Sequence, residues 1–174
     1  MSADSHPATP PPSTAIAAAI TFAAVVLLAG FIALGTALHL QPLYAGFTLL
    51  WFWSSVDMSD LKKLPAAVIG ALCGTATSYL VQFGTVTGNT GLVLLALGII
   101  IVALFMVIAQ RLPLFFNASY MLFVTVMNAP LIQAGENFAN VFASIALSAL
   151  YFGGIFFIGA RIMASRAARV AAAA

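Results

Sequence analysis

Charged residues are rare in this sequence: Asp, Glu, Lys and Arg make up 6% of its 174 residues, whereas a typical soluble domain has about 25%. Hydrophobic residues make up 63%, and the mean hydropathy is +1.12. A soluble fold of this size has too little interior to bury so much apolar surface. The composition therefore excludes a soluble protein and predicts that lipid surrounds most of the chain.

Cysteine and metal-ligating clusters are equally scarce. The single cysteine, Cys73, excludes an intrachain disulfide and a metal site built from cysteine pairs, so we expect it to be a buried packing residue. The sequence contains no grouping of His, Cys, Asp and Glu at ligand spacing, no Ser–His–Asp set and no glycine loop for phosphate. These absences predict a protein that is not an enzyme and uses no metal or cofactor, with an intramembrane enzyme as a remote alternative.

The order of polar and apolar stretches divides the chain into three parts. Residues 1–12 are polar and proline-rich, which predicts a disordered N-terminal tail, and residues 164–174 form a basic, alanine-rich C-terminal tail. Between them, residues 13–163 contain six apolar segments: 13–38, 42–56, 64–83, 91–110, 113–132 and 138–163. Because a full span needs about 20 residues, only the second segment is short. We therefore predict an all-α, polytopic membrane protein with six transmembrane helices.

The basic residues gather at one set of span ends, and no charged residue falls in the middle of a predicted span. With six spans and the N-terminus inside, the inner segments contain Lys62, Lys63, Arg111, Arg161, Arg166 and Arg169. The outer segments contain His39 and Glu136 but no Lys or Arg, as the positive-inside rule requires. We therefore predict an inner-membrane protein with both termini in the cytoplasm. Arg161, Arg166 and Arg169 are predicted to anchor to anionic lipid headgroups, and they are too weak a signal for nucleic acid.

The second and third spans resemble the fifth and sixth in composition. In both pairs an aromatic-rich segment is followed by a helix of small residues. Two interpretations stay open. Three spans per unit would make the halves a 3+3 repeat of inverted topology, as in several transporter folds; alternatively, the similarity is compositional only.

Two side-chain amides, Asn117 and Asn128, lie in the apolar stretch FFNASYMLFVTVMNAP. In a continuous helix they would lie within about 20° of each other on one face, flanked by Tyr120 and Thr125. A bare buried amide costs about 1–3 kcal/mol, which predicts that this face contacts protein or water rather than lipid. Either the amides line a solute path, or they hydrogen-bond to a neighbouring helix.

The third span carries a second polar stripe at helical spacing. Gly70 and Gly74 form a GxxxG pattern, and Ser78 and Gln82 continue it at intervals of four residues, with Thr75 beside it. Small residues allow helix backbones to approach closely, so we expect this stripe to pack against another helix. The alternative is that Thr75, Ser78 or Gln82 lines the solute path.

The stretch YAGFTLLWFWSSVDMSDLKKLPAAVIGALCGTATSYLV carries a family resemblance. It resembles a family of small bacterial inner-membrane proteins, the domain of unknown function 1097, in its aromatic-Ala-Gly-Phe opening, its polar loop with a Leu-Lys step and its small-residue helix. More distantly, it is similar to the membrane half of fusaric-acid-resistance-type aromatic acid exporters, whose basic residue and GT pair are matched by Lys63 and Gly74–Thr75. The resemblance covers about residues 42–155 and implies a helical protein of the bacterial inner membrane.

Together these features predict a channel or facilitator that moves a small, mostly neutral solute through an uncharged polar path. The candidate path residues are Asn117, Asn128, Thr125, Tyr120, Thr48, Thr75 and Ser78. The rival hypothesis is a non-transporting membrane subunit that binds a partner protein, and a small exporter of aromatic or other organic acids comes third. Because a six-helix monomer of 18.1 kDa has little interior, we also expect a homo-oligomer or a partner membrane protein.

Overall fold

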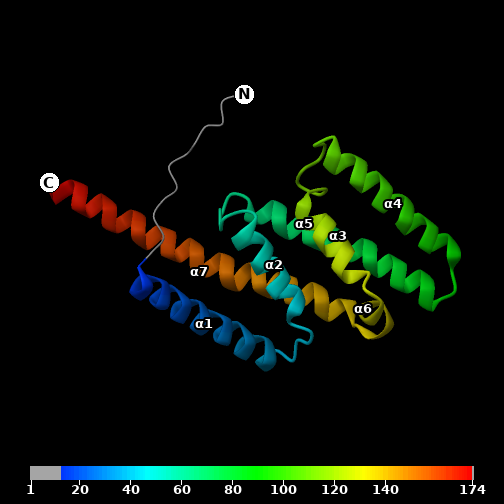
Figure 1. Cartoon of the computed structure of the whole chain (residues 1–174), viewed down its shortest axis with the longest axis horizontal. Coiled ribbons are helices and arrows are strands. Elements are labelled where there is room, and N and C mark those ends of the chain that lie inside the picture. Colours follow the sequence, from blue (N-terminus) through cyan, green and yellow to red (C-terminus); the bar gives the residue numbers. More distant parts are fainter. Residues whose placement is uncertain (1–12, 174) are drawn as a thin grey trace.

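The computed structural model describes residues 13–173, and this part of the chain is all-helical, without a strand (Figure 1). Its helices are α1 (Thr14–Ala37), α2 (Tyr44–Ser55), α3 (Leu64–Val86), α4 (Thr90–Ile108), α5 (Ala118–Met127), α6 (Pro130–Gly135) and α7 (Phe138–Ala173). Four of them, α1, α3, α4 and α7, are long and apolar enough to cross a bilayer. The prediction of an all-helical membrane protein is confirmed at this level, and the tail predicted at 1–12 lies outside the described residues.

The long helices begin at residues that suit a helix start. The side chain of Ser13 accepts a hydrogen bond from the Ile16 N–H and caps α1. Asn89 caps α4 in the same way by accepting from the Leu92 N–H at 3.2 Å. Pro65 lies in the first turn of α3, where its missing N–H leaves no carbonyl unpaired.

Two of the six predicted spans are short helices: the second was predicted to be short, whereas the fifth was predicted to be long enough to cross a bilayer. Helix α2 has 12 residues and α5 has 10, so they are about 18 Å and 15 Å long, roughly half of the hydrocarbon thickness of a bilayer. The prediction of a continuous fifth helix over 113–132 is wrong. The chain passes through turns at 112–117, forms α5, and breaks at Asn128 because Pro130 holds Ala129 in an extended conformation with ψ 137°.

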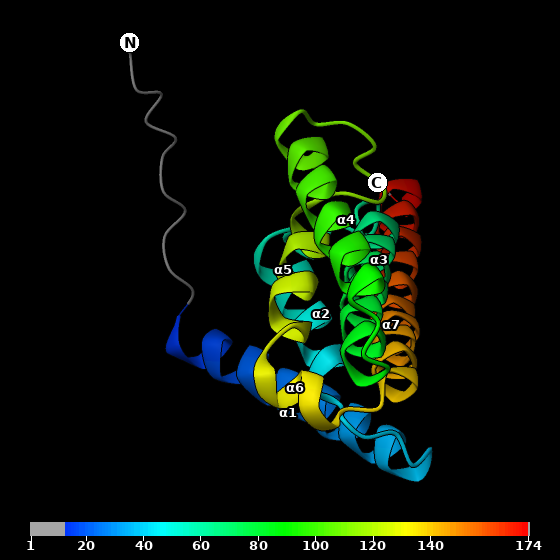
Figure 2. The same cartoon turned by 90° about the vertical axis from the view of Figure 1, so that its right-hand side faces the viewer.

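Consecutive segments alternate in direction. Helix α7 runs antiparallel to α3, since Gly153 lies against Leu64 at the start of α3 while Phe138 stacks on Tyr79 near its end. Helix α5 lies along α3 and α2 lies along α7, each parallel to its long neighbour, and α4 folds back on α3 (Figures 1 and 2). The starts of α1, α3 and α5 and the ends of α2, α4 and α7 therefore share one end of the bundle. We call it the basic end, because Lys62, Lys63 and Arg111 lie in its loops.

Helices α5 and α3 approach so closely that a side chain does not fit between them. A Cβ atom on Gly74 would lie 2.6 Å from the Tyr120 carbonyl oxygen and 3.0 Å from the Val124 nitrogen. The hydroxyl of Ser119 donates to the Ala67 carbonyl oxygen at 2.7 Å, which ties the two backbones together. This is the close helix packing expected for a stripe of small residues.

Helices α2 and α7 meet through a similar small-residue contact. The Gly46 N–H donates to the Ser144 hydroxyl at 3.1 Å, and the Ser148 hydroxyl donates to the Gly46 carbonyl oxygen at 2.7 Å. Each short helix thus packs on the long helix of the other half of the chain. The main core lies between these two pairs, and its fully buried members include Leu49, Phe123 and Ile145.

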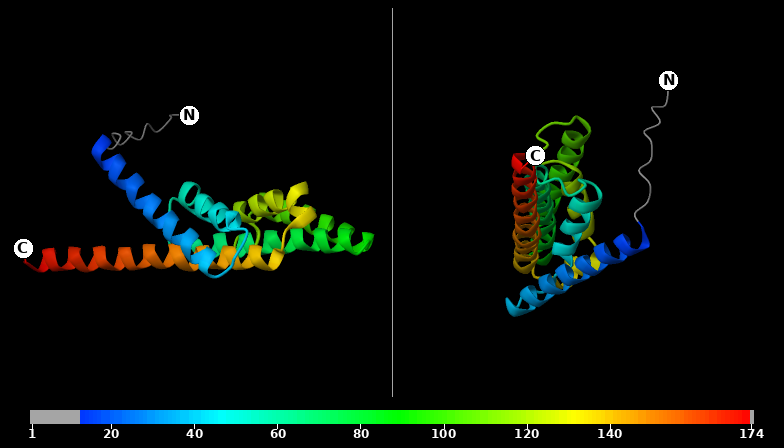
Figure 3. Two further views of the ribbon diagram at one scale, coloured as in Figure 1. Left: turned by 90° about the horizontal axis from the view of Figure 1, so that it is seen from below. Right: turned by 90° about the vertical axis from the view of Figure 1, so that its left-hand side faces the viewer.

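Helix α1 is held mainly at one point. Phe31 is fully buried and packs on Phe47 and Phe152, with ring centroids 5.1 Å and 5.2 Å away. The Tyr151 hydroxyl donates to the Leu27 carbonyl oxygen at 3.1 Å. Away from this contact the N-terminal half of α1 diverges from α7, which continues as a helix to Ala173, ten residues past the predicted span (Figure 3).

The Gly74 contact gives a direct test of the α3–α5 packing. We expect Gly74→Ala to lower the free energy of unfolding by about 1–3 kcal/mol, because the new methyl group meets backbone atoms that no side-chain rotation can clear. Gly98→Ala is the matched control. Its Cβ atom would meet nothing within 4 Å, so it should be neutral or stabilising by up to about 1 kcal/mol. Reversible unfolding in mixed detergent micelles measures both, and equal effects would contradict the close packing.

Candidate functional site

The amide of Asn117 caps one end of α5 and joins it to α3. Its oxygen accepts from the Tyr120 N–H at 3.0 Å, and its nitrogen donates to the Ala66 and Pro113 carbonyl oxygens at 2.8 Å and 2.9 Å. The prediction that both amides lie inside one continuous helix is wrong, because Asn117 and Asn128 flank the ten residues of α5 as its N-cap and C-cap. Both amides bond to α3, so the expectation that they contact protein is confirmed. Their hydrogen bonds are those of the interhelical alternative.

The amide of Asn128 closes the other end of α5. Its nitrogen donates to the Val124 carbonyl oxygen at 2.7 Å and to the Ser78 hydroxyl of α3 at 2.9 Å. The Ser78 hydroxyl in turn lies 3.1 Å from the Gly74 carbonyl oxygen. Ser78 is fully buried, so this chain of hydrogen bonds satisfies both polar side chains within the protein.

Two glutamines complete this polar framework; the sequence analysis assigned Gln82 to the stripe on the third span but did not single out Gln133. Gln133, in α6, donates to the Ser78 and Met127 carbonyl oxygens at 3.1 Å and 2.8 Å. Gln82, near the end of α3, donates to the Gln133 and Glu136 carbonyl oxygens at 3.1 Å and 3.2 Å. They hold the broken segment after α5 against α3. The available signal was a glutamine three residues after Pro130, in a stretch that is otherwise apolar.

A cavity of about 200 Å³ opens at the basic end between α2, α3 and α5. Its polar lining comes from Asp57, Lys63 and Asn117, and Phe52 and Ala67 form its apolar wall. The Lys63 ammonium lies 3.8 Å from the Asp57 carboxylate. Partial burial raises the pKa of Asp57 above its usual value, while the Lys63 charge acts in the opposite direction. We call this the basic-end cavity.

A second cavity, of about 450 Å³, lies at the other end of α3, where α3 meets the start of α7. Gln82, Glu136 and Asn137 contribute its polar groups, and Tyr79 and Phe138 contribute aromatic surface. We call this the opposite-end cavity. The two cavities therefore lie at opposite ends of one helix, and each has polar and apolar walls.

Thr75 lies on α3 between the two cavities. It is eight residues from Ala67 and seven from Gln82, which corresponds to about 12 Å and 11 Å along the helix. Its exposed fraction is 0%, and its hydroxyl oxygen has no hydrogen-bond partner. Within residues 13–173 it is the one buried side-chain polar atom without a hydrogen-bond partner. Burying a polar group without a partner costs about 1–3 kcal/mol, so the presence of this hydroxyl calls for a functional explanation.

The other candidate path residues lie elsewhere. Tyr120 is buried, and its hydroxyl pairs with that of Thr77 at 3.0 Å. Thr48 and Thr125 donate to carbonyl oxygens of their own helices at 2.9 Å and 2.7 Å, and Thr125 is exposed. Of the seven candidates, the structure places Asn117 in a cavity wall and Thr75 between the cavities, while Ser78 and Asn128 bond to each other. A path through all seven stays a prediction.

Cys73 is half-buried and packs beside Ala103 and Tyr120. Among residues 13–173 no three His, Cys, Asp or Glu side chains come close enough to hold a metal ion.

No family model, no curated protein and no solved structure matches the chain. The resemblance to the domain of unknown function 1097 and to the aromatic acid exporters stays a prediction.

Replacing one amide by a carboxylate separates the two roles of Asn117. In a simple N-cap, Asp and Asn are about equivalent. At Asn117→Asp, however, the carboxylate would face the carbonyl oxygens of Ala66 and Pro113 in place of the donating NH2 group. We expect this variant to lose about 2 kcal/mol of unfolding free energy.

The matched control for that variant is Asn89→Asp, which changes an exposed N-cap that accepts from Leu92 and makes no other side-chain hydrogen bond among the described residues. It should unfold like the wild type in the same denaturant titration. If Asn117→Asp were equally harmless, the amide would be acting only as a cap and would not join α5 to α3.

Proposed function

We propose that this protein is a facilitator for a small, mostly neutral solute, and that the solute moves along α3 between the basic-end cavity and the opposite-end cavity. The observation that carries the proposal is the unpartnered, fully buried hydroxyl of Thr75 between the two cavities. The core around it is closed, since Ala71, Phe123 and Ile145 are all fully buried. Passage therefore requires this core to open, and a solute that hydrogen-bonds to Thr75 would favour the open form.

The proposal places the protein in a bacterial inner membrane with six crossings and both termini in the cytoplasm. What supports it is the alternation of the six segments, which brings all the loops that carry Lys62, Lys63 and Arg111 to one end. The short helices α2 and α5 would cross together with their flanking turns. Irregular backbone inside a bilayer is tolerated where protein covers it, and here α3 and α7 do so.

The helix contacts support an inverted repeat, because the first two helices of each half pack on the long last helix of the other half. In the first half, α1 and α2 pack on α7; in the second, α4 and α5 pack on α3. Swapping α1 with α4, α2 with α5 and α3 with α7 leaves these four contacts unchanged, whereas the contacts of α2 with α3 and of α4 with α5 have no counterpart of similar extent. A repeat of this kind places the substrate site near the midplane between the halves, which is where Thr75 lies along α3.

A neutral solute is favoured over an ion because the closed core contains no ionisable side chain among its buried members. The exporter alternative would use Lys63 to attract an organic acid, but Lys63 already has Asp57 beside it. The subunit alternative would use polar faces to bind a partner. The hydroxyls of Ser78, Ser119 and Ser148 instead make hydrogen bonds within the chain, to neighbouring helices.

The test is a swelling assay with purified protein in liposomes, run with glycerol and urea as neutral solutes and benzoate as an aromatic acid. We expect Thr75→Val to slow neutral-solute entry about fivefold, which corresponds to one lost hydrogen bond of about 1 kcal/mol in the transport pathway. Thr85→Val is the matched control. It makes the same change on the same helix, at an exposed residue whose hydroxyl donates to the Val81 carbonyl oxygen.

The free energy of unfolding of the same variants shows whether any loss of flux comes from a destabilised fold. Valine has the shape of threonine without the unpartnered oxygen, so Thr75→Val should raise the free energy of unfolding by about 1 kcal/mol. A variant that is more stable yet slower would support the proposal. Equal rates for Thr75→Val and wild type would refute a path past Thr75. No swelling above empty liposomes would favour the subunit, and benzoate-selective entry would favour the exporter.

A further inference from the structure

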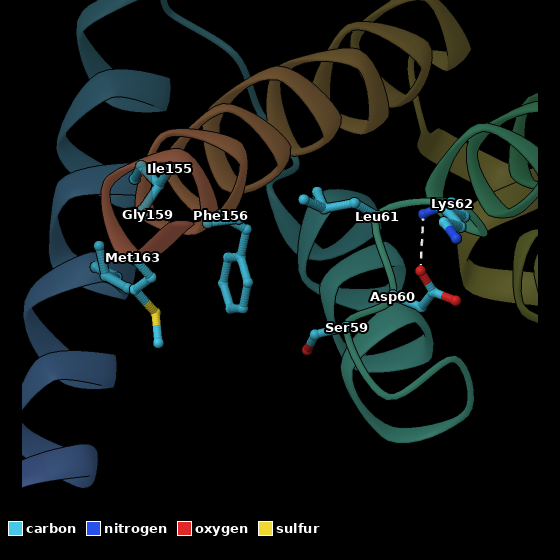
Figure 4. A pocket seen from close by; sticks show the side chains of 10 residues that line it. Ser59, Asp60, Leu61, Lys62, Ile155, Phe156, Gly159 and Met163 are labelled. Atoms are coloured by element: carbon cyan, nitrogen blue, oxygen red, sulfur yellow. Dashed lines mark hydrogen bonds between the residues drawn. The ribbon is translucent and has the colours of Figure 1, made fainter. Parts of the chain in front are cut away.

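A third and larger cavity lies outside the proposed path, between α1, α7 and the loop that joins α2 to α3. Its volume is about 600 Å³. Leu27, Ile155, Phe156 and Met163 form its apolar walls, and the ring of Phe156 and the thioether of Met163 point into the space (Figure 4). We call this space the α1–α7 cleft. It exists because α1 leaves α7 beyond the Phe31 contact (Figure 3).

The polar groups of the cleft are confined to one side, the α2–α3 loop, where Ser59, Asp60 and Lys62 lie. This loop is fixed in place, since the Trp53 indole N–H donates to the Asp60 carbonyl oxygen at 2.9 Å and the Ser59 N–H donates to the Trp53 carbonyl oxygen at 2.9 Å. The cleft thus combines a polar rim at the basic end with apolar walls beyond it. An amphiphile with one polar end fits that distribution.

Near the rim two cations, Lys62 and Arg166, accompany one carboxylate, Asp60, and this balance favours an anion. The Asp60 carboxylate accepts from the backbone N–H of Lys62 at 2.9 Å (Figure 4), and Lys62 itself is exposed. Arg166 follows Gly159 by seven residues and so lies on the cleft side of α7. Between residues 13 and 173 the one ion pair joins Lys63 to Asp57, so neither of these cations has a carboxylate partner there.

We propose that the α1–α7 cleft binds an anionic phospholipid of the surrounding bilayer. An acyl chain lies against Phe156 and Met163, and the phosphate lies near Lys62 and Arg166. The position of the basic residues supports this occupant, since lysine and arginine beside an apolar segment gather at the headgroup level and attract anionic lipid. The site is separate from the path along α3, so it stands or falls independently of solute movement.

Trp53 provides a reporter for the cleft. Its ring centroid lies 5.0 Å from that of Phe156, and Trp51, the other tryptophan of the chain, is 58% exposed and is removed by Trp51→Phe. The full-length Trp51→Phe protein is placed in phosphatidylcholine vesicles that contain a small fraction of lipid with brominated acyl chains, which quench nearby tryptophan. Brominated phosphatidylglycerol should quench Trp53 more strongly than the same fraction of brominated phosphatidylcholine, and its effect should saturate at a lower fraction.

Two variants in that background test the two parts of the site. Lys62→Gln is an exposed change, and it should reduce the preference for phosphatidylglycerol about fivefold, the contribution of one basic residue at a membrane surface. Gly159→Phe should fill the cleft and reduce phosphatidylglycerol quenching to the phosphatidylcholine level. A Cβ atom on Gly159 meets nothing within 4 Å, and the same is true of Gly154, which does not line the cleft. Gly154→Phe is therefore the matched control and should leave quenching unchanged.

Three results would overturn the proposal. The first is equal quenching by the two brominated lipids, and the second is an equal effect of Gly159→Phe and Gly154→Phe. The third is a change of oligomeric mass in Gly159→Phe without any lipid preference in the parent, which would assign the cleft to a second copy of the chain. Should Gly159→Phe fail to fold, the double variant Lys62→Gln/Arg166→Gln decides alone, because an unchanged lipid preference would exclude a headgroup site at these residues.

Discussion

The fold depends on satisfying the backbone polar groups at the ends of helices that are too short to cross a bilayer. Helix α5 has ten residues, so its unpaired N–H and C=O groups lie deep between the long helices, where lipid offers no hydrogen-bond partner. Four side-chain amides, those of Gln82, Asn117, Asn128 and Gln133, bond to carbonyl oxygens at and beyond these ends. They allow the chain to break inside an apolar protein.

The same requirement explains the small residues on α3. Short amide and hydroxyl side chains reach carbonyl oxygens of a neighbouring helix only when the two backbones lie close together, and Gly70 and Gly74 permit that approach. The buried serines Ser78, Ser119, Ser144 and Ser148 and the four amides therefore hold helices together. Thr75 stands out against this background, because its hydroxyl is as deeply buried as that of Ser78 but has no partner.

The outer helices of the two halves, α4 and α1, pack differently on their long neighbours α3 and α7. Helix α4 folds back along α3, whereas α1 is held on α7 mainly around Phe31 and diverges from it towards the basic end (Figure 3). The divergence leaves the α1–α7 cleft open near Lys62, while the proposed path stays between the tightly packed helices. The molecule thus separates an open peripheral cavity from a closed central core, and the loop held by Trp53 borders the cleft.

Hydropathy and charge alone determined the membrane class, the existence of α1, α3, α4 and α7 and the gathering of basic residues at one end, because each depends on local composition. The tertiary structure decided the lengths of α2 and α5 and the use of the amides. An amide such as Asn117 serves equally well inside a helix, at its end or in a path, and the choice depends on which carbonyl oxygens another helix brings within reach. Periodicity therefore placed Asn117 and Asn128 on one helical face, whereas Pro130 and the partners on α3 place them at the two ends of α5. Which of two neighbouring hydroxyls, Thr75 or Ser78, is left without a partner is likewise a property of the assembled helices.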